Sequence, residues 1–152
     1  MDYADANFLV AVHFEVPGHT DLVERYLRRS TRPIVVGELA ELECRNVFAR
    51  LEGRAGGEAW QALVARLDSG GWRREPVIWE SVVAKTRELI DRNAPRFSVG
   101  SLDTMHVAAA VAAGCSTFLS FHSQSNARVL AASARLKVWP ELSGSEKGRL
   151  LR

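Results

Sequence analysis

The sequence has little cysteine, little lysine and no long apolar run. Its two cysteines, Cys44 and Cys115, each lie within an apolar segment, which favours two reduced core thiols over a disulfide framework. No apolar stretch approaches the roughly 18–20 residues that a membrane-spanning helix needs. The amino terminus carries acids and no basic region, so neither a signal peptide nor an anchor is predicted. We therefore expect a cytoplasmic protein with no membrane partner.

Positive charge is carried almost entirely by arginine. Of the 20 basic residues in the 152-residue chain, only Lys85, Lys137 and Lys147 are lysines, and the formal net charge is +2. The planar guanidinium suits phosphate better than an ammonium group does, which is a weak indication of nucleic-acid binding. No basic run marks a charged tail. Because genome base content can also produce an arginine-rich composition, this bias alone defines no function.

Short apolar runs alternate with amphipathic segments along the chain. The pattern predicts strands at 2–4, 33–36, 72–79, 116–121 and 136–139. It predicts helices at 7–14, 19–30, 37–53, 58–71, 81–95, 102–113 and 123–136. This alternation indicates an α/β fold with a central, mostly parallel sheet covered on both faces. We expect one domain over residues 1–140, followed by a C-terminal tail over residues 141–152.

Acidic residues follow or begin several of these elements. Asp5 follows the first strand and His122 follows the strand at 116–121, so both are expected at the carboxyl edge of the sheet, where ligands bind in open parallel sheets. Asp103 lies in the first turn of its helix, near the positive end of the helix dipole. Taken singly, Asp5 and Asp103 are equally typical of helix caps.

Glu43 projects within the apolar face of the helix at 37–53. A carboxylate on the core side of a helix needs a cation, a proton or a metal ion, because burying it alone is costly. Asn46 and Arg50 follow Glu43 along the edge of that face. A surface pair of Glu43 with either residue is therefore the alternative interpretation.

Asp5, Glu43 and Asp103 together indicate a metal site. Hard ions such as Mg²⁺ take oxygen ligands and are held by a few carboxylates, while substrate phosphates complete the coordination shell. Such a metal deprotonates water and stabilises the attacking and leaving oxygens of a phosphodiester. The sequence therefore favours metal-dependent hydrolysis of a phosphodiester.

The chain resembles the PIN-domain ribonucleases, and among them the VapC-like toxins of toxin–antitoxin pairs. The similar segments are YADANFLVA, with an Asp-x-Asn-x-Leu element, ELECRNVFAR, with a helical Glu followed by Asn and Arg, and SLDTMHVAAAVAAG, with an Asp-x-x-His-x-Ala element. The resemblance implies a three-layer PIN-like fold and an endoribonuclease dependent on Mg²⁺ or Mn²⁺. It also implies an RNA substrate, a homodimer and a cognate VapB-like antitoxin.

By this resemblance, Asp5, Glu43 and Asp103 would be the catalytic, metal-binding acids. Asn7, Asn46, Ser120 and His122 would support them.

The chain departs from the family at the end of its fourth strand. The family usually has Thr-x-Asp or Ser-x-Asp there, whereas this chain has Ser120-Phe121-His122 and no acid before Glu141. In one interpretation three acids suffice for one metal, and His122 contributes through a water or as a nitrogen ligand, which suits Mn²⁺ better than Mg²⁺. In the other, the nuclease is weak or lost, and the chain is a silent module that binds RNA or a protein.

Two further expectations concern residues outside this set. His106, three residues after Asp103, is expected to hydrogen-bond within the core. A phosphoacceptor domain is a third hypothesis, which rests on fold analogy alone: Lys137 lies in a segment suitable for the lysine it needs, but Asp2 and Asp5 flank a strand too short for them to serve as its acidic pair.

Overall fold

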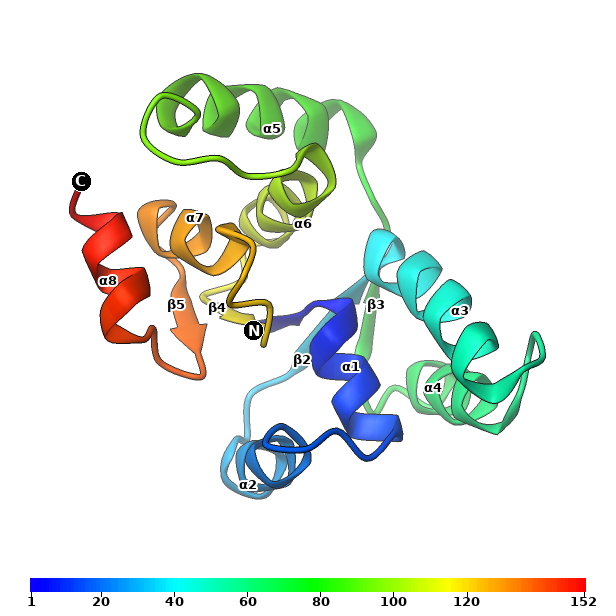
Figure 1. Cartoon of the computed structure of the whole chain (residues 1–152). Helices are drawn as coiled ribbons and strands as arrows, with labels where there is room; N and C mark the ends of the chain where they lie inside the picture. Colours follow the sequence, from blue (N-terminus) through cyan, green and yellow to red (C-terminus); the bar gives the residue numbers. More distant parts are fainter.

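The computed structural model describes residues 1–152, which form a five-stranded sheet with helices on both faces (Figure 1). The strands are β1 (Asp2–Ala4), β2 (Ile34–Gly37), β3 (Arg73–Glu75), β4 (Thr117–Leu119) and β5 (Lys137–Trp139). Their order in the sheet is β3-β2-β1-β4-β5, and every neighbouring pair is parallel. The predicted α/β class and three-layer arrangement are confirmed, with a sheet that is parallel throughout.

Eight helices surround the sheet. They are α1 (Ala6–His13), α2 (Thr20–Arg29), α3 (Glu38–Glu52), α4 (Glu58–Asp68), α5 (Trp79–Asn93), α6 (Ser101–Ala112), α7 (Ala127–Ser133) and α8 (Gly144–Leu150). Gly114 follows the C-terminal end of α6 and has a left-handed φ of 70°. None of these helices is long and apolar enough to cross a membrane.

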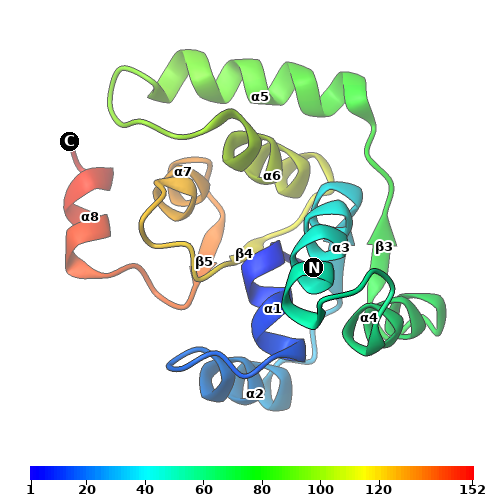
Figure 2. The same cartoon turned by 45° about the vertical axis from the view of Figure 1, so that its right-hand side comes forward.

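Successive side chains along the central strands point to opposite faces of the sheet, and this divides the core into two layers. Ala4 and Val36 belong to one apolar cluster, which includes residues of α1, α2, α3 and α4. Tyr3 and Val35 point the other way, into a second cluster formed with α5, α6 and α7. Figures 1 and 2 show these two groups of helices on opposite sides of the sheet. Because the central strands are buried on both faces, their sequences are almost wholly apolar.

Three elements are clearly shorter than the sequence pattern predicts. β4 ends at Leu119: the Ser120 N–H still donates to the Trp139 carbonyl of β5, but the Phe121 N–H donates to the side chain of Asn7 instead. α7 begins only at Ala127, after a loop that contains His122. The segment at 72–79 is a strand over only three residues, at the edge of the sheet.

The C-terminal residues contain a helix that the sequence pattern did not predict. α8 packs against α7, where Nε of Arg128 donates to Oε1 of Glu146 over 2.7 Å. Both side chains are almost fully buried. The carboxylate of Glu146 also accepts from the backbone N–H of Ser143, whose hydroxyl caps the helix in return. A charged pair therefore attaches this segment to the domain.

Candidate acidic site at the carboxyl edge of the sheet

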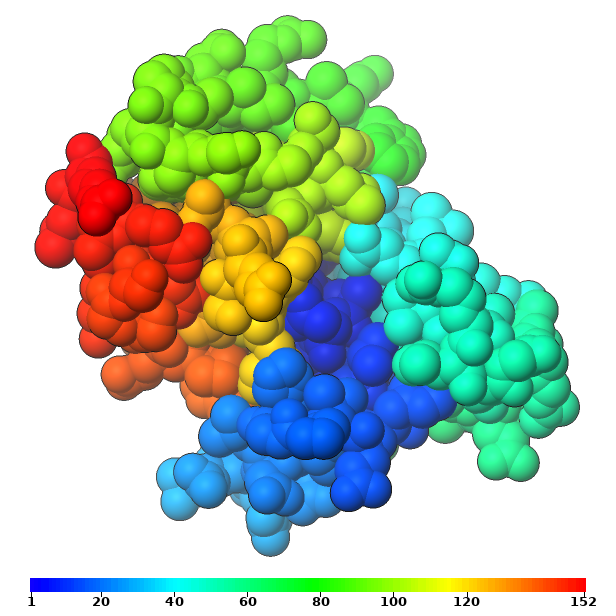
Figure 3. Space-filling model, in the orientation of Figure 1, coloured from blue at the N-terminus to red at the C-terminus, as the bar shows by residue number.

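A cavity of about 440 Å³ lies where β1 and β4 end and α3 and α6 pass over them. Figure 3 shows the first residues of the chain, in dark blue, in a hollow between α3 and the residues around 122. The polar and charged residues that line the cavity are Asp5, Asn7, Glu43, Asn46, Arg50, Asp103, His106 and His122. The structure thus brings the three acids named from the sequence to one cavity, from three distant segments of the chain.

Asp5 is the most deeply buried of the three acids, at 6% exposure. Its Oδ1 accepts from the backbone N–H groups of Asn7 and Phe8, so it caps α1, and its Oδ2 accepts from the side-chain amide of Asn7. Burial raises the pKa of Asp5, although the Ser120 hydroxyl, His106 and the Phe8 N–H oppose that effect. The capping interpretation of Asp5 is correct, and it is compatible with a place in the cavity wall.

Glu43 pairs with a residue that sequence reasoning had assigned to the core. Its Oε2 lies 3.0 Å from Nε2 of His106, whereas the alternative partners, Asn46 and Arg50, are exposed residues of the cavity rim. His106 is 3% exposed, and its Nε2 has no partner at full hydrogen-bond geometry, so this contact is chiefly electrostatic. Burial alone would lower the pKa of His106, but the contact with Glu43 and the charges of Glu43, Asp5 and Asp103 outweigh it and raise the pKa.

Asp103 faces the histidine that replaces the missing acid. Its Oδ1 lies 3.8 Å from Nδ1 of His122, whose side chain is 49% exposed. The backbone N–H of His122 donates to the Ser120 hydroxyl over 3.1 Å. His122 therefore belongs to the cavity wall, where its backbone is hydrogen-bonded to Ser120 and its ring lies near Asp103.

Asn7 joins the two strand ends that carry the site. Its Oδ1 accepts from the Phe121 N–H over 2.7 Å and lies 3.5 Å from the donating Ser120 hydroxyl. Its amide nitrogen donates to Asp5, as described above. Asn7 and Ser120 therefore fix the end of β1 against the end of β4, which is consistent with the supporting positions named for them from the sequence.

The donor chemistry of the cavity fits a hard divalent ion, but the side chains are not gathered around one point. Three carboxylates line one cavity, as such an ion requires. No group of three or more His, Cys, Asp or Glu side chains is close enough together to hold a metal. One oxygen of Glu43 lies against His106 and one oxygen of Asp103 lies near His122, so each carboxylate would offer its other oxygen to an ion shared with Asp5, after moving closer to it.

Lys137 lies too far from this edge for the phosphoacceptor hypothesis. It begins β5 and pairs with Thr117, the first residue of β4. It therefore lies at the amino end of the strands, whereas Asp5 lies at their carboxyl end.

The sheet is parallel throughout, and an acidic cavity lies at the carboxyl ends of its strands. The protein is therefore an α/β protein with a candidate cation site. A family model described as PIN domain matches residues 3–136. The chain belongs to the PIN domain family. No curated protein matches the sequence closely enough to be counted as a relative.

Solved structures agree with this fold. The Mycobacterium tuberculosis toxin VapC20, described as cleaving the sarcin-ricin loop, is similar with a TM-score of 0.67 and 16% identity, over 88% of this chain and 95% of that one. FitAcB from Neisseria gonorrhoeae has a TM-score of 0.60 and 15% identity, over 91% and 96% of the two chains. VapBC2 from Rickettsia felis, bound to a DNA fragment from its promoter, has a TM-score of 0.58 and 13% identity, over 91% and 97%. The resemblance to VapC-like PIN domains is thereby confirmed at the level of fold.

Proposed function

We propose that the protein is a metal-dependent endoribonuclease that cleaves RNA phosphodiester bonds, as the toxin of a VapBC-type toxin–antitoxin system. The observation that carries the proposal is the convergence of Asp5, Glu43 and Asp103 on one cavity in a PIN domain. The similarity in fold to an RNA-cleaving toxin supports the same chemistry.

In this proposal, Asp5, Glu43 and Asp103 hold Mg²⁺ or Mn²⁺. The bound ion would supply an activated water and neutralise charge on the scissile phosphate. Asn7 and Ser120 keep Asp5 at the floor of the cavity, and Asn46 lines its rim. Arg50, an exposed guanidinium on the same rim, is placed to contact RNA phosphate.

Cleavage of RNA by the purified chain tests this proposal. Wild type is expected to cut a structured RNA with Mn²⁺ or Mg²⁺ and to stop when the metal is chelated. Asp5→Asn should abolish cleavage while keeping the helix cap, because asparagine caps as well as aspartate. Asp91→Asn, an exposed position on α5 outside the cavity, is the matched control and should cut like wild type. Equal cleavage by Asp5→Asn would contradict the proposal.

A silent PIN module that binds RNA or a protein is the second candidate. The observation that favours it is the position of His122, which stands 3.8 Å from Asp103 where the resemblance implies a fourth acid. Under this alternative the wild type leaves RNA uncut with Mn²⁺ and still binds it, as gel-shift titration with the same RNA would show.

The proposed protein partners are a VapB-like antitoxin and a second copy of the chain. The fold similarity to VapBC2 supports the first. Exposed apolar side chains on and beside α5 support the second, namely Ile78, Trp79, Val83, Ile90 and Leu102.

Sedimentation equilibrium tests the homodimer. Val83→Lys places a charge among these apolar side chains and is expected to give monomers. Ala65→Lys makes the same change of charge at an exposed position on α4 and should leave the dimer intact. A monomeric wild type would contradict the proposed dimer.

A further inference from the structure

His106 connects the acidic cavity to a tyrosine on the core side. Its Nδ1 lies 3.2 Å from the hydroxyl of Tyr3, and its Nε2 lies 3.0 Å from Oε2 of Glu43. Tyr3 and His106 are 1% and 3% exposed, so water does not compete for the contact between them. The imidazole therefore stands between a residue of β1 and the one acid that the helix α3 contributes.

While the imidazole is neutral, the Tyr3 hydroxyl either donates to Nδ1 or accepts from an Nδ1–H, and only the first arrangement gives the buried phenol hydrogen a partner. A phenol has an ordinary pKa of about 10, so Tyr3 keeps its proton at neutral pH. The ring nitrogen of His106 is the only hydrogen-bond partner of that hydroxyl. A neutral imidazole that accepts at Nδ1 carries its hydrogen on Nε2. The hydrogen then lies on the nitrogen that faces Glu43.

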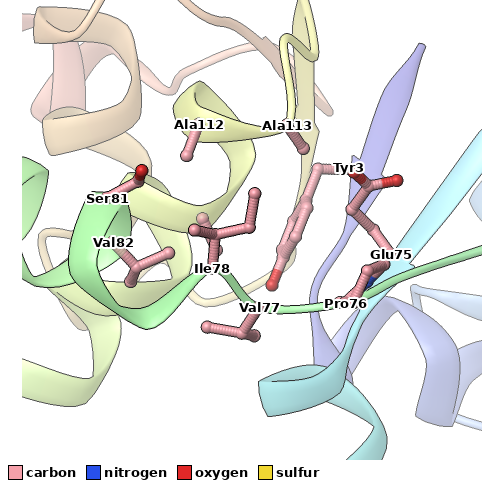
Figure 4. Close-up of a pocket in the computed structure, with 11 residues that line it drawn as sticks. Tyr3, Glu75, Pro76, Val77, Ile78, Ser81, Val82, Ala112 and Ala113 are labelled. Atoms are coloured by element: carbon pink, nitrogen blue, oxygen red, sulfur yellow. The ribbon is translucent and has the colours of Figure 1, made fainter.

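The position of the Tyr3 hydroxyl is determined by its surroundings. Its ring stacks on Phe118 with centroids 5.8 Å apart and planes 6° from parallel. A cavity of about 60 Å³ lies beside the ring, and Figure 4 shows Val77, Ile78 and Val82 across that space from Tyr3. At position 37 a Cβ would stand 2.8 Å from the hydroxyl, so the absence of a side chain at Gly37 leaves room for it.

We propose that Tyr3 and His106 are positioning residues for Glu43. The Tyr3 hydroxyl holds His106 as the Nε2–H tautomer, and that tautomer orients the Glu43 carboxylate. The inference rests on the proposed function, because it assigns the tautomer a purpose in holding Glu43 ready for a metal. Residues that contact a metal ligand, but not the metal itself, typically change the protein's affinity for the metal by about 10–100-fold when they are replaced.

Nitrogen NMR of the metal-free protein tests the tautomer directly. A ¹⁵N–¹H correlation spectrum, recorded at alkaline pH where the ring is neutral, is expected to show His106 entirely as the Nε2–H form. Tyr3→Phe removes only the hydroxyl and should give a mixture of tautomers. Gly37→Ala should shift the same signals, since the backbone φ of −78° accepts alanine and the neighbouring cavity lets the tyrosine ring move. An Nδ1–H form in wild type, or a spectrum unchanged by Tyr3→Phe, would overturn the inference.

Two substitutions of His106 then separate positioning from simple packing. Glutamine places its amide near the position of Nε2, whereas asparagine places its amide near that of Nδ1. In calorimetric Mn²⁺ titrations, His106→Gln should keep an affinity close to wild type, and His106→Asn should lose about tenfold or more. If wild type binds Mn²⁺ and both variants lose the same amount of Mn²⁺ affinity, the positioning role of His106 is overturned and the proposed function is not. A wild type that binds no Mn²⁺ would contradict the proposed function and the role of His106 with it.

Discussion

Nδ1 of His122 lies 3.8 Å from Oδ1 of Asp103, in the wall of the acidic cavity. The family resemblance implies an acid at this position, which would add a negative charge beside the metal site. An imidazole supplies none, so attraction for a cation is weaker here.

Replacement of His122 should therefore strengthen metal binding. We expect His122→Asp to raise Mn²⁺ affinity roughly fivefold to tenfold, the effect of one added charge a few ångströms away at a protein surface. Calorimetric titration measures this change. Gln124→Glu adds the same charge two residues along the loop, at an exposed position outside the cavity lining, and should change affinity much less. Unchanged affinity in His122→Asp would mean that His122 is only a loop residue.

The ion pair between Arg128 and Glu146 should be a principal determinant of stability. Arg128 also donates to the carbonyl oxygens of Ser120, Pro140 and Glu141, so it connects α7 and α8 with the end of β4. Arg128→Met is expected to lower the free energy of unfolding by about 3–5 kcal/mol, because it leaves a buried carboxylate without its cation. Urea denaturation measures the loss.

A double variant identifies the cause of that loss. Glu146→Gln combined with Arg128→Met removes the unpaired charge and can still accept from Ser143, so it should be less destabilised than Arg128→Met alone. A double variant at least as unstable as the single one would show that the lost carbonyl contacts, not the uncompensated charge, dominate.

Acid should weaken this pair selectively. Burial would raise the pKa of Glu146, but hydrogen bonds from Arg128 and Ser143 and the charge of Arg128 outweigh it and lower the pKa. A carboxylate with a lowered pKa adds stability above its ordinary value of about 4.3, and that stability is lost as the pH falls through the folded-state pKa. The melting-temperature difference between wild type and Glu146→Gln should therefore shrink on acidification below that value. A difference that stays constant would contradict the pairing.

Replacing glycine by alanine should change the free energy of unfolding in opposite directions at two positions, one just after α6 and one within α8. Gly114 has a φ of 70°, so Gly114→Ala is expected to cost about 1–2 kcal/mol although no atom blocks the new methyl group. Gly148 lies within α8 with open space around it, so Gly148→Ala should add about 0.5–1 kcal/mol. Chemical denaturation of the two variants measures both signs, and a loss at both positions would contradict the helical assignment of α8.

Much of the site followed from the sequence because parallel strands bring their carboxyl ends to one edge. Asp5 and His122 follow β1 and β4, and their cavity positions were predicted on that ground. Glu43 was recognised because it lies within an apolar helical face, where a carboxylate requires a partner. Its partner was not recognised, because the contact with His106 depends on how α3 and α6 meet, which no local pattern contains.

The C-terminal helix α8 was missed for a related reason. Hydrophobic periodicity detects helices that bury apolar faces, but the most deeply buried residue of α8 is Glu146. Its capping box, Ser143 with Glu146 three residues later, was the available signal in the sequence. The early end of β4 was equally beyond local patterns, since the Phe121 N–H leaves the ladder for the side chain of Asn7, which lies more than a hundred residues earlier.

The central claim is that Asp5, Glu43 and Asp103 form one divalent-metal site, and thermal unfolding with and without Mn²⁺ tests it most directly. A ligand that binds only the folded state stabilises it by RT ln(1 + [L]/Kd) and so raises the melting temperature. We predict that Mn²⁺ raises the melting temperature of wild type and of Asp91→Asn, and leaves those of Asp5→Asn and Asp103→Asn unchanged. Equal increases in all four proteins would contradict the site.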